Sequence, residues 1–255
     1  MLLCKKISKT LFFFKKNWPF LKDIIPNDYI DIHSHLLPNI DDGATSIEDT
    51  INMMTDLTNI GFKEFVTTPH VIKHVWENSK LSIEEKHFQT SNEIREMGIS
   101  NSFKVAAEYM LDDHFRNLIS EEKLLTIKDN YVLVEMSYLN PPIALYDILF
   151  ELQVAGYQPI LAHPERYNFY HFALENYQKL KHAGCLFQLN LLSSVGYYGV
   201  NVSKTADYLL KNNLIDFVGS DVHHNNHVAS FDKKIVLKNH DILKTVAQNN
   251  SIFKS

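Results

Sequence analysis

Short apolar segments, many of them β-branched, alternate with segments of helical periodicity from residue 28 to the last residue. The apolar segments predict seven strands, at residues 29–32, 64–67, 103–106, 131–134, 158–162, 186–189 and 215–218. The sequence predicts helices between them, from an N-cap at Ser46 to Gly61, from Ser82 to near Gly98, from Pro141 to Gly156, from Ala173 to His182, and from an N-cap at Ser203 to Lys211. Strands that alternate with helices form βαβ units around a parallel sheet. Seven such units predict an α/β protein, either a barrel close to the (β/α)8 type or an open doubly wound sheet.

Side chains that commonly bind metals follow most of the predicted strands. His33 and His35 come after the first strand, and the period of two places both on one side of the chain. Later strands end in His70, Glu108, Glu135, His163, Asn190, Asp221 and His223. A single histidine at such a place is usually a hydrogen-bonded structural residue, but imidazoles and carboxylates gathered at one barrel mouth cost stability unless a cation neutralises them. The sequence therefore predicts a metal site at the end of the barrel where such folds carry their active sites.

The number of candidate ligands exceeds what one ion needs. The candidates are His33, His35, Asp42, His70, Glu108, His163, Asp221 and His223. A protein-bound ion takes roughly four to six ligands, so this set predicts a centre of two or three divalent ions. Nitrogen and oxygen ligands without thiolate suit manganese, iron, zinc or cobalt. Glu135 and Asn190 are interpreted as side chains that orient the ligands.

Charge is distributed unevenly along the 255 residues, whose net charge is −5. Residues 1–22 contain six lysines and no acidic residue, whereas residues 23–255 contain 19 basic and 30 acidic side chains. A nucleic-acid binder needs clustered lysine and arginine, so the acidic main body argues against nucleic acid as a partner. Two cysteines cannot form a disulfide framework, which favours a cytoplasmic location.

Residues 1–27 are predicted to form a basic N-terminal arm, and residues 28–255 a single domain. Lys15 and Lys16 interrupt the apolar run in the arm, so it is too short for a signal peptide. No segment of the chain reaches the roughly 18 apolar residues of a membrane span. The arm is expected to be a solvated extension or a short helix packed on the domain. The alternative is that residues 1–22 attach the protein peripherally to an anionic membrane surface.

Several catalytic motifs are absent from the sequence. A thiol-dependent tyrosine phosphatase needs an arginine six positions after its cysteine, but Thr10 follows Cys4 and Leu191 follows Cys185 at that spacing. No glycine precedes a lysine, and no two glycines are separated by one residue. These absences exclude a Walker A loop and a dinucleotide-binding fingerprint.

Six motifs follow one another in order: Asp31-Ile32-His33-Ser34-His35-Leu36-Leu37-Pro38, Asp41-Asp42-Gly43, Thr68-Pro69-His70, Ala107-Glu108, His163-Pro164-Glu165-Arg166-Tyr167 and Gly219-Ser220-Asp221-Val222-His223. This order resembles the PHP (polymerase and histidinol phosphatase) superfamily and, within it, the capsular-polysaccharide protein-tyrosine phosphatases. The resemblance covers about residues 28–225. It implies a single-domain, distorted (β/α)7 TIM-like barrel that carries a trinuclear metal centre.

The resemblance also implies roles for individual residues. It implies one ion bound by His33, His35, Glu108 and Asp221, a second held by Glu108, His163 and His70, and remaining sites completed by Asp42, His70 and His223. Asp42 is preferred over Asp41 as the ligand. Arg166 matches the arginine that contacts phosphate and is the predicted catalytic residue. Where the family often has a second arginine, this sequence has His223-His224-Asn225-Asn226-His227, so His224, His227 or Lys233 replaces that arginine or the contact is missing.

The activity implied by the resemblance is hydrolysis of phosphotyrosine on a protein by a metal-activated hydroxide. The expected substrate and partner is a bacterial inner-membrane tyrosine kinase that controls capsule or exopolysaccharide synthesis. Manganese is the expected metal, with iron, zinc or cobalt as alternatives. Two other hypotheses share the fold: a phosphatase of histidinol phosphate or another small molecule, and a catalytically weak barrel that binds a kinase as a regulatory module. The sequence makes no prediction of the oligomeric state.

Overall fold

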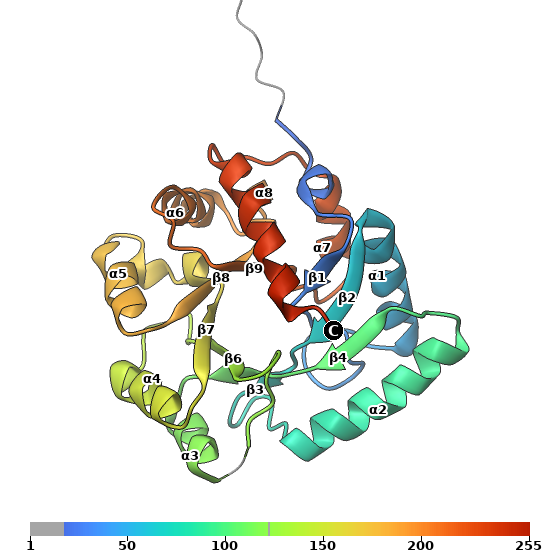
Figure 1. Cartoon of the computed structure of the whole chain (residues 1–255), viewed down its shortest axis with the longest axis horizontal. Coiled ribbons are helices and arrows are strands. Elements are labelled where there is room, and N and C mark those ends of the chain that lie inside the picture. Colours follow the sequence, from blue (N-terminus) through green and yellow to red (C-terminus); the bar gives the residue numbers. More distant parts are fainter. Residues whose placement is uncertain (1–17, 122) are drawn as a thin grey trace, which may run out of the picture.

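The computed structural model describes residues 18–121 and 123–255, and strands alternate with helices along them (Figure 1). The strands are β1 (Tyr29–Asp31), β2 (Phe62–Thr67), β3 (His70–Val71), β4 (Ser102–Val105), β5 (Glu108–Met110), β6 (Tyr131–Glu135), β7 (Gln158–Ala162), β8 (Leu186–Asn190) and β9 (Phe217–Gly219). The helices are α1 (Ile47–Ile60), α2 (Lys80–Glu96), α3 (Asp113–Glu121), α4 (Leu145–Val154), α5 (Glu175–His182), α6 (Val200–Lys211), α7 (Asn225–Ala229) and α8 (His240–Asn249).

Two parallel sheets contain these strands, one in the order β1-β2-β4 and one in the order β3-β5-β6-β7-β8-β9. The sheets are continuous with each other because β3 follows β2 and β5 follows β4 after breaks of only two residues. Hydrogen bonds cross these breaks, from Ala106 N–H to the Thr67 carbonyl (2.9 Å) and from Glu108 N–H to the Pro69 carbonyl (3.0 Å). The nine short strands of the described residues thus occupy seven strand positions around the barrel, because β2 with β3, and β4 with β5, each form one interrupted strand.

The first and last positions are also joined. Asp221 N–H donates to the His33 carbonyl (2.8 Å), and Ser34 and Val222 form a parallel bridge. The seven positions therefore form a ring, with helices on the outside and α8 crossing one end (Figure 1). The predicted distorted seven-position barrel is confirmed, and the interrupted strands are its distortion.

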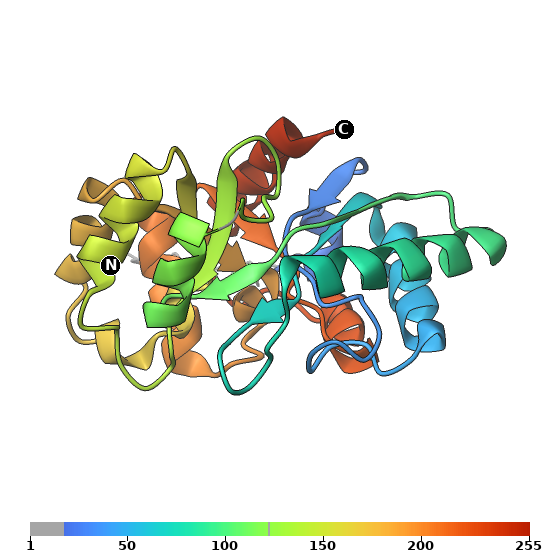
Figure 2. The same cartoon turned by 90° about the horizontal axis from the view of Figure 1, so that it is seen from below.

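Inward-facing side chains change character along the strands. At the N-terminal end they form an apolar cluster that includes Ile30, Val66 and Leu133, which Phe253 closes from the C-terminal segment. Two residues after Leu133, and therefore on the same face, comes Glu135. In the perpendicular view the C-terminus and the long loops after the strands lie on opposite sides of the molecule (Figure 2). The interior is thus apolar at one end and polar at the other.

The predicted helix ends are confirmed for α1. The Ser46 side chain accepts a hydrogen bond from Asp49 N–H (3.1 Å), and Gly61 ends the helix with φ = 124°, a conformation that favours glycine. The predicted start of α2 is wrong by three residues, because Ser79 is the N-cap and Ser82 completes a reciprocal capping box with it.

Two further helix starts differ from prediction. The N-cap of α6 is Gly199, and Ser203 lies inside the helix. The Ser203 hydroxyl donates to the Ser193 carbonyl (2.8 Å) instead of capping the helix. The prolines Pro141 and Pro142 form a turn before α4, which begins at Leu145. The sequence did not predict α3, α7 and α8. The last predicted strand, 215–218, is observed as Phe217–Gly219.

The part of the predicted N-terminal arm that the structure describes packs on the domain. Leu21, in the short 3-10 helix Leu21–Ile24, is fully buried, and its N–H donates to the Lys233 carbonyl (3.0 Å). Lys22 pairs with Asp232 at 2.6 Å. The other five lysines of the arm, and its predicted membrane contact, lie outside the described residues. Among the helices of the described residues, none combines the length and apolar character of a membrane span.

Candidate metal centre

Four buried side chains from three segments of the barrel converge at its C-terminal end. His33 Nε2 lies 3.2 Å from Glu108 Oε2 and 3.2 Å from Asp221 Oδ1. His35 Nε2 lies 3.4 and 3.3 Å from the same two oxygens and 3.3 Å from His33 Nε2. All four side chains are at most 2% exposed. Ligands about 2.0–2.1 Å from a tetrahedral ion lie about 3.3 Å apart, so the separations between the two imidazoles, and from each imidazole to both carboxylates, match those of ligands around one ion.

Hydrogen bonds from the other ring nitrogens orient the two histidines. His33 Nδ1 donates to Gln188 Oε1 (2.7 Å), and His35 Nδ1 donates to Asp41 Oδ2 (2.8 Å). Asp41 is itself held by the backbone N–H groups of Gly43 and His70. Such contacts place the Nε2 atom of each imidazole toward the centre as a ligand. No pattern in the sequence indicated this orienting role for Gln188 or Asp41.

A second group lies around the same Glu108 carboxylate. Glu108 Oε1 is 3.0 Å from His163 Nε2, and Glu108 Oε2 is 3.1 Å from His70 Nδ1. Glu135 Oε1 is 2.9 Å from His70 Nδ1, so Glu135 belongs to a candidate ligand group and not only to the residues around it. The sequence signal for Glu135 is the same as that for Glu108, a glutamate within two residues of the end of a predicted apolar strand.

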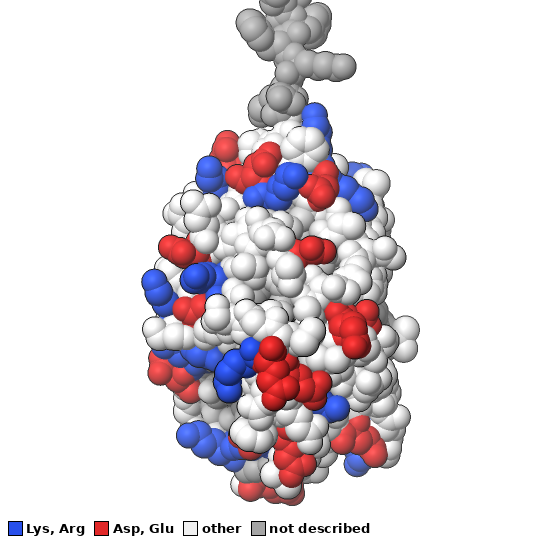
Figure 3. All heavy atoms as spheres, turned by 90° about the vertical axis from the view of Figure 1, so that its right-hand side faces the viewer, with Lys and Arg blue, Asp and Glu red and all other residues white. Residues whose placement is uncertain are grey.

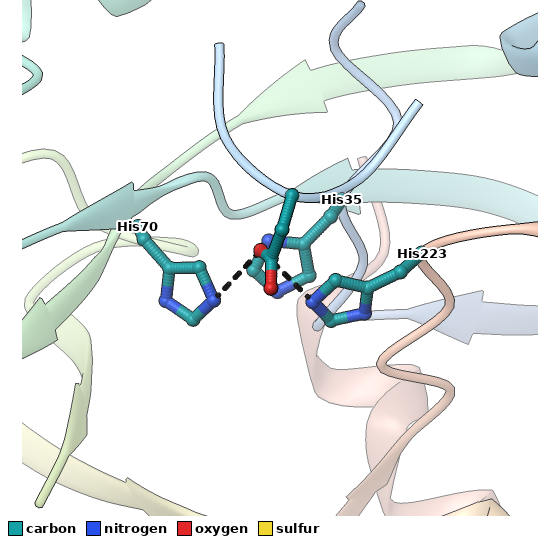
Figure 4. Close-up of side chains that lie close together, drawn as sticks. His35, His70 and His223 are labelled. Atoms are coloured by element: carbon teal, nitrogen blue, oxygen red, sulfur yellow. Dashed lines mark ion pairs between the residues drawn. The ribbon is translucent and has the colours of Figure 1, made fainter. Parts of the chain in front are cut away.

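A third group lies at the outer rim. The Asp42 carboxylate is 3.5 Å from His70 Nε2 and 3.5 Å from His223 Nε2, and it is 57% exposed. Figure 4 shows the rings of His70 and His223 on either side of His35, and the dashed lines mark these two ion pairs. The four residues offer ligand atoms within 4.8 Å of one another. The structure thus brings together all eight sequence-predicted ligands, arranged in three overlapping groups.

The electrostatics of the centre demand positive charge. Burial disfavours a charged His33, but the carboxylates of Glu108 and Asp221 outweigh burial and raise the pKa of His33 to about 10. Conversely, burial would raise the pKa of Glu108, but His33 and His70 hold it well below its usual range. Divalent cations would supply the positive charge that the protons on these imidazoles otherwise supply.

Unpaired buried atoms also fit bound cations. Within the described residues, His70 Nδ1, Glu135 Oε1 and His163 Nδ1 are buried and have no hydrogen-bond partner. His70 Nδ1 and Glu135 Oε1 lie close together without hydrogen-bond geometry, as two ligands of one ion would. Burial, followed by the charge of Arg166, lowers the pKa of His163 to about 4, so this imidazole is neutral and able to bind a metal. The residues present therefore fit a group of divalent metals.

Arg166 lies at the mouth of the centre. Its Nη1 donates to Asp221 Oδ2 (2.8 Å), and its guanidinium lies 4.8 Å from the ring of Tyr138 and 4.1 Å from that of Tyr198. The side chain is 20% exposed. A cavity of about 220 Å³ is lined by Asp42, Arg166, Tyr198, His223, His224 and His227. An anion in this cavity would meet the guanidinium beside the rim histidines.

Of the three candidates for a second phosphate contact, two lie at the cavity beside Arg166 and one does not. His224 and His227 line the cavity with Arg166, whereas Lys233 lies over the ring of Tyr197 and outside the lining. His227 Nδ1 accepts a hydrogen bond from His223 N–H (3.2 Å), which places the ring proton on Nε2. Asn190 donates to Asp221 Oδ2 (2.7 Å) and so orients a candidate ligand, as expected.

The chain is similar to proteins of capsule synthesis. A family model described as capsular polysaccharide synthesis, CpsB/CapC, matches residues 29–235. Tyrosine-protein phosphatase YwqE of Bacillus subtilis (strain 168) is 30% identical over 198 residues, 76% of this chain and 77% of that protein. Tyrosine-protein phosphatase CpsB of Streptococcus pneumoniae is 28% identical over 204 residues, 76% of this chain and 82% of that protein.

Solved structures share the architecture. Crystal structures of YwqE from Bacillus subtilis and CpsB from Streptococcus pneumoniae, described as unique metal-dependent tyrosine phosphatases, match with a TM-score of 0.76 and 25% identity over 88% of this chain and 90% of that chain. An amidohydrolase from Mycoplasma synoviae matches with a TM-score of 0.50 at 12% identity, over 89% of this chain and 86% of that chain. The second likeness concerns the fold alone.

Proposed function

We propose that this chain, which belongs to the capsular polysaccharide synthesis family CpsB/CapC, is a metal-dependent phosphatase that hydrolyses phosphotyrosine in proteins. The observation that carries the proposal is the convergence of two imidazoles, His33 and His35, on two carboxylates, Glu108 and Asp221, directly beside Arg166. Each imidazole Nε2 lies 3.2–3.4 Å from both carboxylates. Hydrolysis of a phosphomonoester needs metal ions to activate water and positive charge to hold the phosphate oxygens. The ligand groups and the neighbouring Arg166 guanidinium can supply both.

The three groups of side chains would hold the ions. His33, His35, Glu108 and Asp221 would bind one ion. Glu108, Glu135, His163 and the Nδ1 of His70 would bind a second. Asp42, His70 and His223 would bind a third. Divalent cations in such sites lower the pKa of bound water to near neutrality and neutralise phosphate oxygens. Their nitrogen and oxygen ligands suit manganese, which is the metal we propose.

The side chains of the chain itself bind and orient the substrate. The planar guanidinium of Arg166 can contact two phosphate oxygens at once, and Asp221, Tyr138 and Tyr198 hold it in place. The Nε2–H of His227 is available to donate to a further oxygen. The tyrosyl leaving group has a pKa of about 10, so a strong general acid is not required.

A phosphorylated tyrosine kinase of the capsule pathway is the proposed protein substrate. The names of the relatives support a phosphotyrosyl protein as substrate, and the family description supports a role in capsule synthesis. Nucleic acid is not a proposed partner. On the face shown in Figure 3, basic and acidic side chains are interspersed, without a basic field that would track phosphates. We also propose that the protein acts in the cytoplasm and that its basic arm contacts the inner membrane. Removal of residues 1–17, which leaves the packed segment from Trp18 intact, should abolish binding to anionic vesicles.

The function is tested by turnover of three substrates. Purified protein loaded with Mn²⁺ should hydrolyse a chromogenic aryl phosphate and a phosphotyrosyl peptide, and a chelator should abolish both activities. Histidinol phosphate should be a poor substrate. Turnover of histidinol phosphate without turnover of the peptide would support a small-molecule phosphatase instead. Binding of a phosphotyrosyl protein without any turnover, at full metal content, would support a regulatory module.

A further inference from the structure

A groove lies beside the candidate metal centre, between the loops that follow β5 and β6. Its volume is about 480 Å³, and its apolar lining includes Met110, Leu111, Pro142, Ile143 and Ile148. The side chain of Ile143 is fully exposed. A concave, mostly apolar lining with an exposed isoleucine at its edge suits an apolar side chain of a ligand.

The strands that form the groove also carry the candidate ligands. Met110 comes two residues after Glu108 on β5, and Ser137, which also lines the groove, comes two residues after Glu135 at the end of β6. Met110 pairs with Glu135 in register. Two residues of strand span about 7 Å, so the groove begins one side-chain length from the carboxylates of the centre.

One residue of the chain links the groove to the phosphate subsite. Tyr138 follows Ser137 directly, and its ring lies 4.8 Å from the guanidinium of Arg166. A phosphotyrosine held by Arg166 therefore has this groove within reach of the residues next to it in its chain. A free aryl phosphate has no such residues and cannot use the groove.

The charge of the groove restricts what binds there. Asp112 and Asp113 lie among the lining residues, and no basic residue of the described chain does. The nearby Arg116 is engaged by both oxygens of Glu151. Asp112 caps α3 through Phe115 N–H (2.8 Å), whereas Asp113 is exposed. An apolar side chain accompanied by a lysine or arginine complements this surface.

We propose that the groove is a docking subsite for the substrate polypeptide, which takes a large apolar side chain within about three residues of the phosphotyrosine and favours a basic residue next to it. This inference rests on the proposed function. A docking subsite of this kind explains why the protein would select a polypeptide over a small aryl phosphate. Binding energy from residues remote from the phosphate then contributes to kcat/KM.

The test is a set of phosphotyrosyl peptides with serine at all flanking positions and a single leucine moved from three residues before the phosphotyrosine to three residues after it. Each kcat/KM is divided by that for a chromogenic aryl phosphate with the same enzyme preparation. Leucine at one or two positions on one side should raise this ratio about tenfold, since an apolar side chain gains this much on partial burial. Lysine beside that leucine should raise it about twofold further, and glutamate should lower it.

Variants locate the effect. Ile143→Ser should remove most of the gain from leucine, and Asp113→Asn the gain from lysine. Val154→Ser is the matched control, because Val154 is also an exposed β-branched residue of the same region, at the opposite end of α4. It should leave the leucine preference as in the wild type.

A flat leucine scan, or an equal effect of Ile143→Ser and Val154→Ser, would overturn the docking subsite while leaving the phosphatase function in place. A change of oligomeric state in Ile143→Ser would assign the groove to a second copy of the chain and overturn the proposal. If neither aryl phosphate nor peptide is hydrolysed, the proposed function is wrong. Binding to the groove is then measured by fluorescence anisotropy, with the same peptides carrying a non-hydrolysable phosphonate. Equal affinity across the leucine scan would contradict the docking subsite.

Discussion

The two ends of the barrel interior are built by the same strands and have opposite chemistry. At the N-terminal end Ile30, Leu133 and Phe217 pack with Phe253 in an apolar cluster. At the other end, buried just as deeply, Glu135 follows Leu133 on the same face of β6 after two residues, and Asp221 follows Phe217 after four residues, just beyond the end of β9. The first end is stabilised by its own contacts, whereas the second gathers charges that water no longer solvates. The apolar residues at the N-terminal ends of the strands therefore stabilise the fold, and the polar residues at the C-terminal ends form the candidate site.

The largest effect is expected from removal of a ligand at the polar end. His33→Ala should lower kcat/KM for a phosphotyrosyl peptide by at least about 1000-fold, because the first group loses one of its four ligand atoms. Metal content measured by elemental analysis should fall with it. The matched control is His74→Ala, since His74 is 78% exposed and lies outside the candidate ligand groups. Equal activity of His33→Ala and His74→Ala would place the metal centre elsewhere.

A substitution at the apolar end should lower the stability of the protein and leave its activity and metal content unchanged. Phe253→Ala should destabilise the protein by about 3–4 kcal/mol, because it leaves a cavity under the barrel. Specific activity per folded molecule should be unchanged at a temperature where the variant is folded. Urea denaturation measures the first quantity, and Ile252→Ala, at a neighbouring residue that is 48% exposed, is the control and should cost far less. A loss of metal from Phe253→Ala would show that the two ends are not separate.

Arg166→Lys tests the rim of the polar end. The variant keeps the charge but loses the planar fork and its stacking between two tyrosines, so kcat/KM should fall about 100-fold with the metal content unchanged. Arg95→Lys, a change of the same type in α2 away from the cavity, should have no effect. Loss of metal together with activity in Arg166→Lys would assign Arg166 a structural role through Asp221 instead.

The smallest effect is expected from His227→Phe, which keeps an aromatic ring and removes the Nε2–H donor. The loss of one uncharged hydrogen bond to the phosphate should lower kcat/KM about tenfold, mostly through KM. His224→Phe is measured alongside, because both rings line the cavity. An unchanged KM for His227→Phe, with a raised KM for His224→Phe, would transfer the contact to His224.

Several features of the protein could be predicted from the sequence because they depend on neighbouring residues. The cap at Ser46 and the end at Gly61 are local, and both are confirmed. The ligand types at strand ends were also visible, since a parallel barrel brings the ends of all its strands to one face. The wrong start of α2 shows the limit of such rules, because Ser79 and Ser82 are both good caps and only the packed helix selects between them.

The tertiary structure alone decided which side chains meet. Glu108 and Glu135 both follow a predicted strand in the sequence, but in the structure Glu108 begins β5 and Glu135 ends β6. Only the register of β5 on β6 places Glu135 beside His70. Likewise Gln188 reaches His33 across 155 residues of sequence. His227 reaches the cavity from the five-residue helix α7, which the sequence did not predict. Local sequence determines the conformation and type of each strand end, because propensities and caps act over a few residues. Distances of 3 Å between remote atoms depend on the register and closure of the whole ring, which no local pattern encodes.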